Sequence, residues 1–210
     1  MGSSTPQARR SDTRERIQKT ALDLFVSRGY EKTTLREIAG ELGVTKAALY
    51  YHFKTKEDIL GAISEDLGRP VDELIAWAKE QPPGLETRRE LLSRYSTALK
   101  SAMPIYHILQ ENQATLRDLA IGQALRERVE NISRLMHSGD IGFDTHIRVS
   151  SALLTVHFGA FTLDALGGSA ERKRQALLKV ALETLDSTDT AASTDLAASA
   201  ARPAEGVPTG

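Results

Sequence analysis

Residues 33–56 constrain the fold more than any other stretch, because they specify two short helices and the turn between them. The first helix has an apolar stripe at positions i, i+3, i+4 and i+7, formed by Leu35, Ile38, Ala39 and Leu42. Thr34 can cap this helix in a capping box with Glu37. Gly43 can end it in the left-handed conformation, and Thr45 can cap a second helix. Two short helices around a turn with glycine form a helix-turn-helix motif.

In a helix-turn-helix, the start of the second helix meets base edges in the DNA major groove. Here that start is Lys46, Ala47 and Ala48. Lys46 can donate to guanine, and the two small alanines allow close approach and contact with thymine methyl groups. Arg36, on the preceding helix, is a further candidate for base contact. We therefore predict that these four residues read the DNA sequence.

A second set of side chains can donate to phosphate oxygens and hold the motif in register. Lys56 would act together with the N-terminus of the helix that follows it, where a phosphate is favoured. The expected phosphate contacts are Thr34, Thr45, Tyr50, Tyr51, His52 and Lys56.

The run from Gly43 to Lys56, Gly-Val-Thr-Lys-Ala-Ala-Leu-Tyr-Tyr-His-Phe-Lys-Thr-Lys, resembles the signature of the TetR (tetracycline repressor-like) family of bacterial transcriptional regulators. Phe25, Gly29-Tyr30 and residues 33–39 are similar to that family's first two helices. The specific match covers roughly residues 13–60, and beyond it the likeness is one of architecture. The resemblance implies a homodimeric repressor that binds a palindromic operator in double-stranded DNA and is released by a small-molecule effector.

The whole chain is predicted to be all-α, since no alternation of apolar and polar residues is long enough for a strand. We expect an N-terminal three-helix DNA-binding domain and a C-terminal helical domain for ligand binding and dimerisation. The predicted divisions are a flexible arm (1–11), the DNA-binding domain (12–55), the helical body (56–186) and a disordered tail (187–210). The tail prediction depends on the near absence of large apolar side chains.

Several helix ends are predicted from glycine and proline. Asp12 should start the first helix, and Gly68-Arg69-Pro70 should break or kink the fourth. The following segments should be helical: 85–101, a short piece after Pro104, 113–137, 144–166 and 169–185.

Composition excludes several function classes. There are no cysteines among the 210 residues, so no disulfide framework, thiolate chemistry or cysteine zinc site is available. No apolar run is long enough to span a membrane, and the polar N-terminus is no signal peptide, so we expect a cytoplasmic protein. Catalytic motifs are missing too, and we predict no enzyme, cofactor or metal site. The net charge is +3 over residues 1–60 and −4 over the rest, which suits a DNA-binding front.

Small-molecule pockets are mostly apolar and rich in aromatic side chains. Only 5% of the residues are aromatic, so a cluster of them in the body would be informative. The candidate pocket residues are Trp77, Tyr95, Met103, Tyr106, Gln110, Asn112, His157, Phe158 and Phe161. The set carries no net charge, which favours a neutral or weakly polar apolar effector. For each residue, simple core packing is the alternative.

The helices expected at 144–166 and 169–185 have surplus apolar surface, and in the resembling family this pair forms a four-helix dimer interface. A dimer would place its recognition helices about 34–36 Å apart, one turn of DNA, or at a related spacing. Two other functions stay open at this point. One is a constitutive DNA-binding regulator without an effector; the other is a ligand carrier or enzyme built on the helical body.

Overall fold

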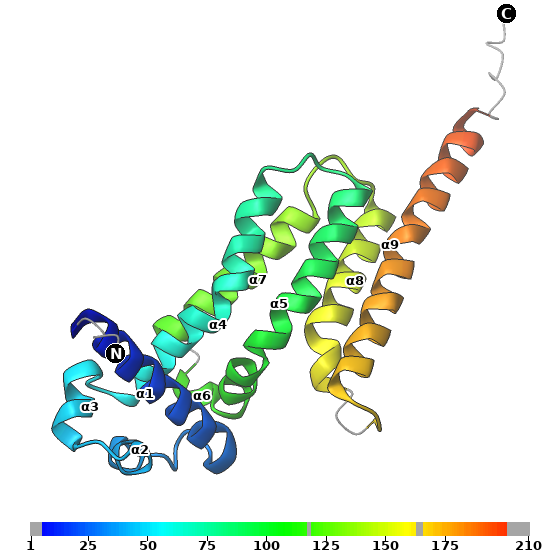
Figure 1. Ribbon diagram of the computed structural model, residues 1–210. Coiled ribbons are helices and arrows are strands. Elements are labelled where there is room, and N and C mark those ends of the chain that lie inside the picture. The colour runs from blue at the N-terminus through cyan, green and yellow to red at the C-terminus, as the bar shows by residue number, and fades with distance from the viewer. Residues whose placement is uncertain (1–5, 117–118, 163–165, 201–210) are drawn as a thin grey trace, which may run out of the picture. The chain divides into compact units, whose positions relative to one another are not determined.

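The chain folds into helices joined by short loops (Figure 1). The computed structural model describes residues 6–116, 119–162 and 166–200. Within these ranges every regular element is a helix and no strand occurs, which confirms the predicted all-α fold. None of the helices in these ranges is long and apolar enough to cross a membrane.

In chain order the helices are α1 (Pro6–Arg28), α2 (Leu35–Leu42), α3 (Lys46–His52), α4 (Lys56–Lys79), α5 (Leu85–Glu111), α6 (Gln113–Leu116), α7 (Ala120–Met136), α8 (Phe143–Thr162) and α9 (Ala170–Ala200). They fall into two compact units. The first combines the residues up to Ala76 with Thr97–Asn131, and the second combines Trp77–Ser96 with the residues from Ile132 onward. Packing thus places α1–α3 in one unit with parts of α4, α5 and α7, whereas the sequence suggested a division after residue 55.

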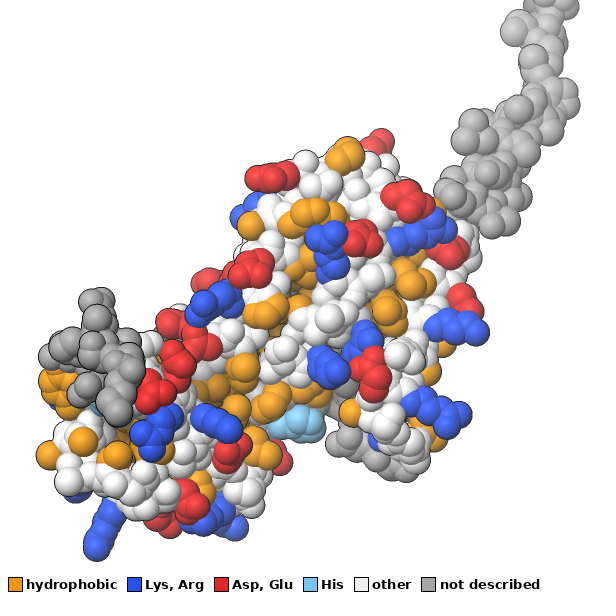
Figure 2. Space-filling view, in the orientation of Figure 1, with side chains coloured by type: hydrophobic (Ala, Val, Ile, Leu, Met, Phe, Trp, Pro, Cys, Tyr) orange, Lys and Arg blue, Asp and Glu red, His pale blue; other side chains and the backbone are white. Residues whose placement is uncertain are grey.

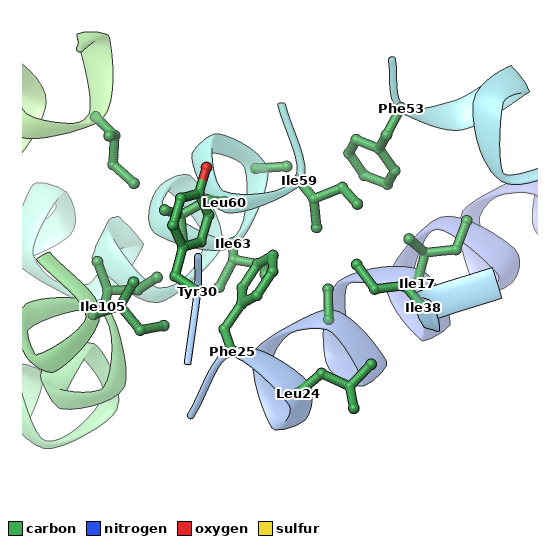
Figure 3. Packing of buried hydrophobic residues seen from close by; sticks show 14 of the residues in the cluster. Ile17, Leu24, Phe25, Tyr30, Ile38, Phe53, Ile59, Leu60, Ile63 and Ile105 are labelled. Atoms are coloured by element: carbon green, nitrogen blue, oxygen red, sulfur yellow. The ribbon is translucent and has the colours of Figure 1, made fainter. Parts of the chain in front are cut away.

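The core of the first unit forms where α1, α2 and α4 meet (Figure 3). The predicted buried stripe of α1 is confirmed, because Ile17, Ala21, Leu24 and Phe25 are all buried. The rings of Phe25 and Tyr30 pack edge to face with centroids 5.0 Å apart. These side chains contact Ile59, Leu60 and Ile63 of α4, so α4 is joined to the helix-turn-helix by a continuous apolar core.

In the second unit α8 and α9 lie side by side (Figure 1). Gly159 of α8 allows this close approach, since a Cβ at that position would collide with the Leu177 side chain of α9. Arg88 of α5 is buried and closes the end of α7, donating from Nε to the Met136 carbonyl at 2.9 Å and from Nη2 to the Ser138 carbonyl at 2.7 Å. These carbonyls would otherwise lack partners at a helix C-terminus.

The first helix begins earlier than predicted. Residues 6–11, which we expected in a flexible arm, are the first turns of α1, so the prediction that Asp12 starts the helix is wrong. Pro6 suits the first turn of a helix, and glutamine, alanine and arginine after it are good helix formers. The Ser11 hydroxyl donates to Glu15 one turn later at 2.9 Å. Residues 1–5 lie outside the described residues.

Neither Pro70 nor Pro104 ends a helix, because α4 runs through Pro70 and α5 runs through Pro104. Of the break or kink expected at residues 68–70, the break does not occur. Each proline removes one backbone hydrogen bond. The buried faces continue on both sides of it, with Ile63 and Val71 around the first and Ala102 and Ile105 around the second. Burial of these faces offsets the lost hydrogen bond.

Other boundaries also differ from expectation. The helix predicted at 113–137 is divided into α6 and α7, with residues 117–118 outside the described residues. Helix α8 ends at Thr162, and Leu166 lies in a bend, while residues 163–165 are not described.

The tail prediction is wrong for residues 187–200, which continue α9 as far as Ala200. Low apolar content argues against burial, but alanine has the highest helix propensity and extends a helix that is already anchored by packing. Leu185, which is fully buried, provides the last such anchor before this stretch. Residues 201–210 lie outside the described residues.

Candidate nucleic-acid interface and ligand pocket

The turn between α2 and α3 has the predicted caps. Thr34 and Glu37 form the capping box, in which the Thr34 hydroxyl oxygen accepts from the Glu37 N–H and Glu37 Oε2 accepts from the Thr34 N–H at 2.8 Å. Gly43 has a φ of 69°, and its N–H donates to the carbonyls of Ala39 and Gly40. Only glycine takes this left-handed backbone without a steric penalty. The turn is therefore encoded by local sequence.

Helix α3 buries one side and presents the other. Thr45 caps it, accepting from the Ala48 N–H at 3.2 Å. Leu49 and, at the C-cap, Phe53 are buried, as predicted. Because they hold α3 against the core, the start of the helix, Lys46, Ala47 and Ala48, is exposed. Three of the four residues predicted to read bases are therefore exposed together at the start of α3.

Polar aromatic side chains follow on α3. The ammonium of Lys46 lies 5.3 Å from the centroid of the Tyr50 ring, one turn along the helix. Tyr51 is 64% exposed, and its ring packs edge to face on His52 at 5.3 Å between centroids. Arg36 of α2 is exposed as well. These side chains carry hydroxyl, imidazole and guanidinium groups that can donate to phosphate oxygens.

Two predicted phosphate contacts are already engaged within the protein. The Thr34 hydroxyl donates to Glu37 Oε2 at 2.7 Å, and the same oxygen accepts a hydrogen bond from the Thr34 N–H. These bonds hold the pKa of Glu37 below its ordinary value and place a carboxylate where a phosphate was expected. Lys56 donates from Nζ to the Tyr30 carbonyl at 2.9 Å and lies over the Tyr30 ring.

Further contacts, which sequence reasoning missed, brace the motif from α1 and α4. The Arg14 guanidinium lies 4.3 Å from the centroid of the Phe53 ring, at the end of α3. Gln18 of α1 donates to Asp66 of α4 at 2.7 Å. The Tyr30 hydroxyl donates to Glu57 at 2.7 Å, and burial together with this bond raises the pKa of Tyr30. No spacing rule joins such distant positions; the only signal was a polar Gln18 beside the buried stripe of α1.

Charged side chains of both signs are mixed on the face of the molecule that Figure 2 shows. On the face shown in Figure 2, lysine and arginine side chains alternate with aspartate and glutamate. A large basic patch would supply affinity for any nucleic acid. This view shows no such patch, and the candidates for contact with nucleic acid are individual exposed donors such as Lys46 and Arg36.

The candidate ligand residues are divided between the two units. In the second unit, the Tyr95 hydroxyl and His157 Nδ1 lie 2.7 Å apart, and the His157 ring packs edge to face on Phe158 with centroids 4.5 Å apart. Burial lowers the pKa of His157 to about 4, so the imidazole is neutral at pH 7. Trp77 lies under the Arg94 guanidinium at 4.2 Å. The side chain of Phe161 lies outside the described residues.

The other four candidates, Met103, Tyr106, Gln110 and Asn112, belong to the first unit. Met103 and Tyr106 are half-buried, Gln110 is exposed, and Asn112 Nδ2 donates to the Ile108 carbonyl at 2.7 Å near the end of α5. The structure thus brings Tyr95, His157 and Phe158 together and gives Asn112 a local backbone bond. The nine residues do not form one group within either unit.

The described residues contain no group of three or more histidine, aspartate or glutamate side chains placed to hold a metal ion. His137 and His146 approach each other, with ring centroids 4.4 Å apart. Both ring nitrogens of His137 have partners, since Nδ1 lies 2.7 Å from the Ser133 carbonyl and Nε2 lies 3.0 Å from the Ser150 hydroxyl. His137 therefore has a structural role at the end of α7.

A comparison with protein-family models matches residues 17–63 to the family described as bacterial regulatory proteins, tetR family. Among curated proteins, the chain is 40% identical over 83 residues to the transcriptional regulator AcrR of Shigella flexneri, covering 39% of each protein. It is 27% identical over 153 residues to the transcriptional repressor Rv3405c of Mycobacterium tuberculosis, covering 71% of this chain and 72% of the repressor.

Solved structures agree in fold. The TetR-family regulator PfmR of Thermus thermophilus has a TM-score of 0.61 and 26% identity, covering 80% of this chain and 97% of PfmR. The chain spans only 17% to 48% of the length of the first curated relatives that it matches. The residues matched by the family model, 17–63, include the whole helix-turn-helix.

Proposed function

Because this chain belongs to the tetR family of bacterial regulatory proteins, we propose that it is a DNA-binding transcriptional repressor released from a palindromic operator by a small apolar effector. The observation that carries this proposal is the geometry of α2 and α3. Gly43 turns the chain, Leu49 is buried, and Lys46 begins an exposed helix face. That face has the shape and donors for a major groove.

In the proposed complex, Lys46, Ala47, Ala48 and Arg36 read bases. Thr45, Tyr50, Tyr51 and His52 donate to phosphates and set the register. Thr34 and Lys56 act mainly by holding the motif in place, since the structure already uses their donors. Lys56 retains its charge, which attracts the DNA backbone as well.

The proposed homodimer uses α8 and α9. Helix α8 exposes Ile147, Leu154 and Phe158 on one side, at 52%, 54% and 51% of their surfaces, and α9 exposes Val180. Several large exposed apolar side chains on two packed helices are typical of a protein interface. A two-fold dimer through this face would supply two recognition helices for the two halves of a palindrome.

Replacing Leu154 by aspartate tests this interface. In a two-fold dimer the change places two buried charges in an apolar interface, so we expect the dimer dissociation constant to rise at least about a hundredfold. Sedimentation measures the monomer fraction. Lys179→Ala on exposed α9 surface is the matched control and should remain dimeric. A Leu154→Asp protein that stays dimeric would place the interface elsewhere.

Lys46 and Lys56 should behave differently when replaced by alanine. Lys46→Ala is expected to remove about 1–3 kcal/mol of discrimination between operator and random DNA, because it loses a base contact. Lys56→Ala should weaken binding to both DNAs and lower stability by about 1 kcal/mol, because its bond to the Tyr30 carbonyl is lost. Fluorescence anisotropy at two salt concentrations and urea unfolding measure these effects. Equal losses on both DNAs for both variants would contradict this division of roles.

The function itself is tested by selecting bound duplexes from a randomised pool. We expect enrichment of a palindrome whose affinity falls steeply with salt. A pool that remains random after selection would contradict sequence-specific regulation. Once an operator is known, compounds that lower its affinity identify the effector, because a ligand weakens DNA binding only through its differential affinity for the two states of the protein.

A further inference from the structure

Arg128 is a charged residue on the buried side of α7. It follows Ile121 and Leu125 and precedes Ile132 at helical spacing, and only 12% of its side chain is exposed. The guanidinium lies directly on the backbone of α4, since a Cβ at Gly68 would be 2.5 Å from Arg128 Cζ. Gly68, which we expected to end a helix, instead makes room for this arginine.

Asp72 of α4 compensates the charge of Arg128. Nε donates to Asp72 Oδ1 and Nη2 donates to Oδ2, both at 2.8 Å. This bidentate pair raises the pKa of Arg128, so the guanidinium stays charged. The third nitrogen, Nη1, is buried and has no hydrogen-bond partner among the described residues.

A second polar atom lies on the same side of α4. Ser64 precedes Gly68 by four residues and Asp72 by eight, so the three positions form one stripe along the helix. The Ser64 hydroxyl is also buried and without a partner in the described part of the chain. Buried polar groups are nearly always paired, and each one left unpaired is destabilising. Ser64 Oγ, and Arg128 Nη1 where it lies against Gly68, are therefore two hydrogen-bonding atoms that a bound molecule could pair with.

Apolar residues adjoin this polar pair in the sequence of both helices. Ile63 and Leu125 belong to the core cluster of the first unit, and Leu67 packs against it. A molecule seated here would therefore need an apolar body with a small polar group. The charge of that group is constrained, because Asp72 already balances Arg128 and the carboxylate of Glu65 also acts on the guanidinium. A ligand carboxylate would meet both negative charges.

We propose that Arg128 Nη1 and Ser64 Oγ are the polar end of the effector site, and that they bind a neutral acceptor, the carbonyl oxygen of a ketone, ester or amide on an apolar molecule. This inference rests on the proposed function and names the chemical class of the effector. Nη1 is covered in the present state, so α4 and α7 must separate at Gly68 to admit the carbonyl. Such a ligand prefers the separated state and shifts the protein toward it.

The test uses the 210-residue protein and a panel of neutral aryl and alkyl ketones, each with its isosteric hydrocarbon and its carboxylate counterpart, for example acetylnaphthalene, isopropenylnaphthalene and naphthoate. Thermal shift and titration should show binding of ketones in preference to both counterparts. Ser64→Ala should raise the melting temperature of the ligand-free protein, because an unpaired hydroxyl is removed, yet weaken ketone binding about tenfold. Arg128→Met should weaken ketone binding by a similar factor.

Arg69→Met is the matched control, since Arg69 lies on the same helix in an exposed pair with Asp66; its ketone affinity should equal that of the wild type. The proposal is overturned if hydrocarbons or carboxylates bind better than ketones, if no member of the panel binds, or if Ser64→Ala and Arg128→Met leave ketone affinity unchanged. Operator selection is a separate readout. A palindrome without a ketone response overturns only the ligand class, whereas a ketone response without any operator overturns only the regulatory function.

Discussion

Replacing Phe25 by alanine is expected to lower the free energy of unfolding by about 3–5 kcal/mol, the range for deleting a buried phenylalanine ring. Phe25 is 1% exposed and packs edge to face on Tyr30. Its ring lies where α1 meets α4 (Figure 3). The cavity left by the missing ring would therefore weaken the packing of α1 on α4, which holds the helix-turn-helix in place. Loss of DNA binding should accompany the loss of stability, although Phe25 is far too buried to contact DNA.

Urea unfolding followed by circular dichroism measures the stability change. The neighbouring Val26 is 60% exposed, and Val26→Ala is therefore the matched control, with an expected change of less than about 0.5 kcal/mol. A comparable loss in both variants would contradict the view that burial of Phe25 against α4 is what stabilises this domain, because alanine raises helix propensity at both positions.

Acidification should destabilise the second unit through His157. Its pKa falls from the ordinary 6.5 to about 4 because the imidazole is buried. Below about pH 6.5 the His157 imidazole therefore binds a proton in the unfolded chain, whereas in the folded protein it stays neutral until the pH approaches 4. The free energy of unfolding is therefore unaffected by His157 above pH 6.5. As the pH falls from 6.5 toward 4, it decreases by about 3 kcal/mol in all.

Trp77 is the only tryptophan and belongs to the same unit, so its fluorescence reports this transition in urea. His157→Gln should remove the decline between pH 6.5 and 4, leaving only the part that other groups contribute. His146→Gln, which changes an exposed histidine of α8, should retain the decline. If His157→Gln follows the wild-type pH dependence, the buried imidazole does not govern acid stability.

The helix-turn-helix was predictable because its signals are local. The Thr34–Glu37 capping box, the left-handed Gly43 and the Thr45 cap each involve residues within one helical turn. The same locality explains why the exposed face of α3 was predicted correctly from Leu49 and Phe53 alone. A short helix has one buried side, and two apolar residues are enough to define it.

Prediction failed where a local preference was outweighed by distant packing. Pro70 and Pro104 locally favour a helix end, but the apolar faces on both sides of them are buried against other helices. Gly68 was interpreted as a helix terminator, whereas its lack of a side chain accommodates Arg128, sixty positions away. The charged Arg128 within the apolar stripe of α7 was the available signal, and only its partner Asp72 explains it.

The sequence by itself determined the helical class of this protein, its caps and turn, and the side chains that face outward from α3, since each depends on residues that are neighbours along the chain. Tertiary structure alone decided which prolines a helix tolerates and that Lys56 bonds to Tyr30. It also decided that Ser64 and Arg128 each keep a polar atom without a partner in the part of the chain that the structure describes. These outcomes depend on burial and on contacts between residues that are far apart in the sequence. The free energy of such contacts cannot be inferred from a local sequence pattern.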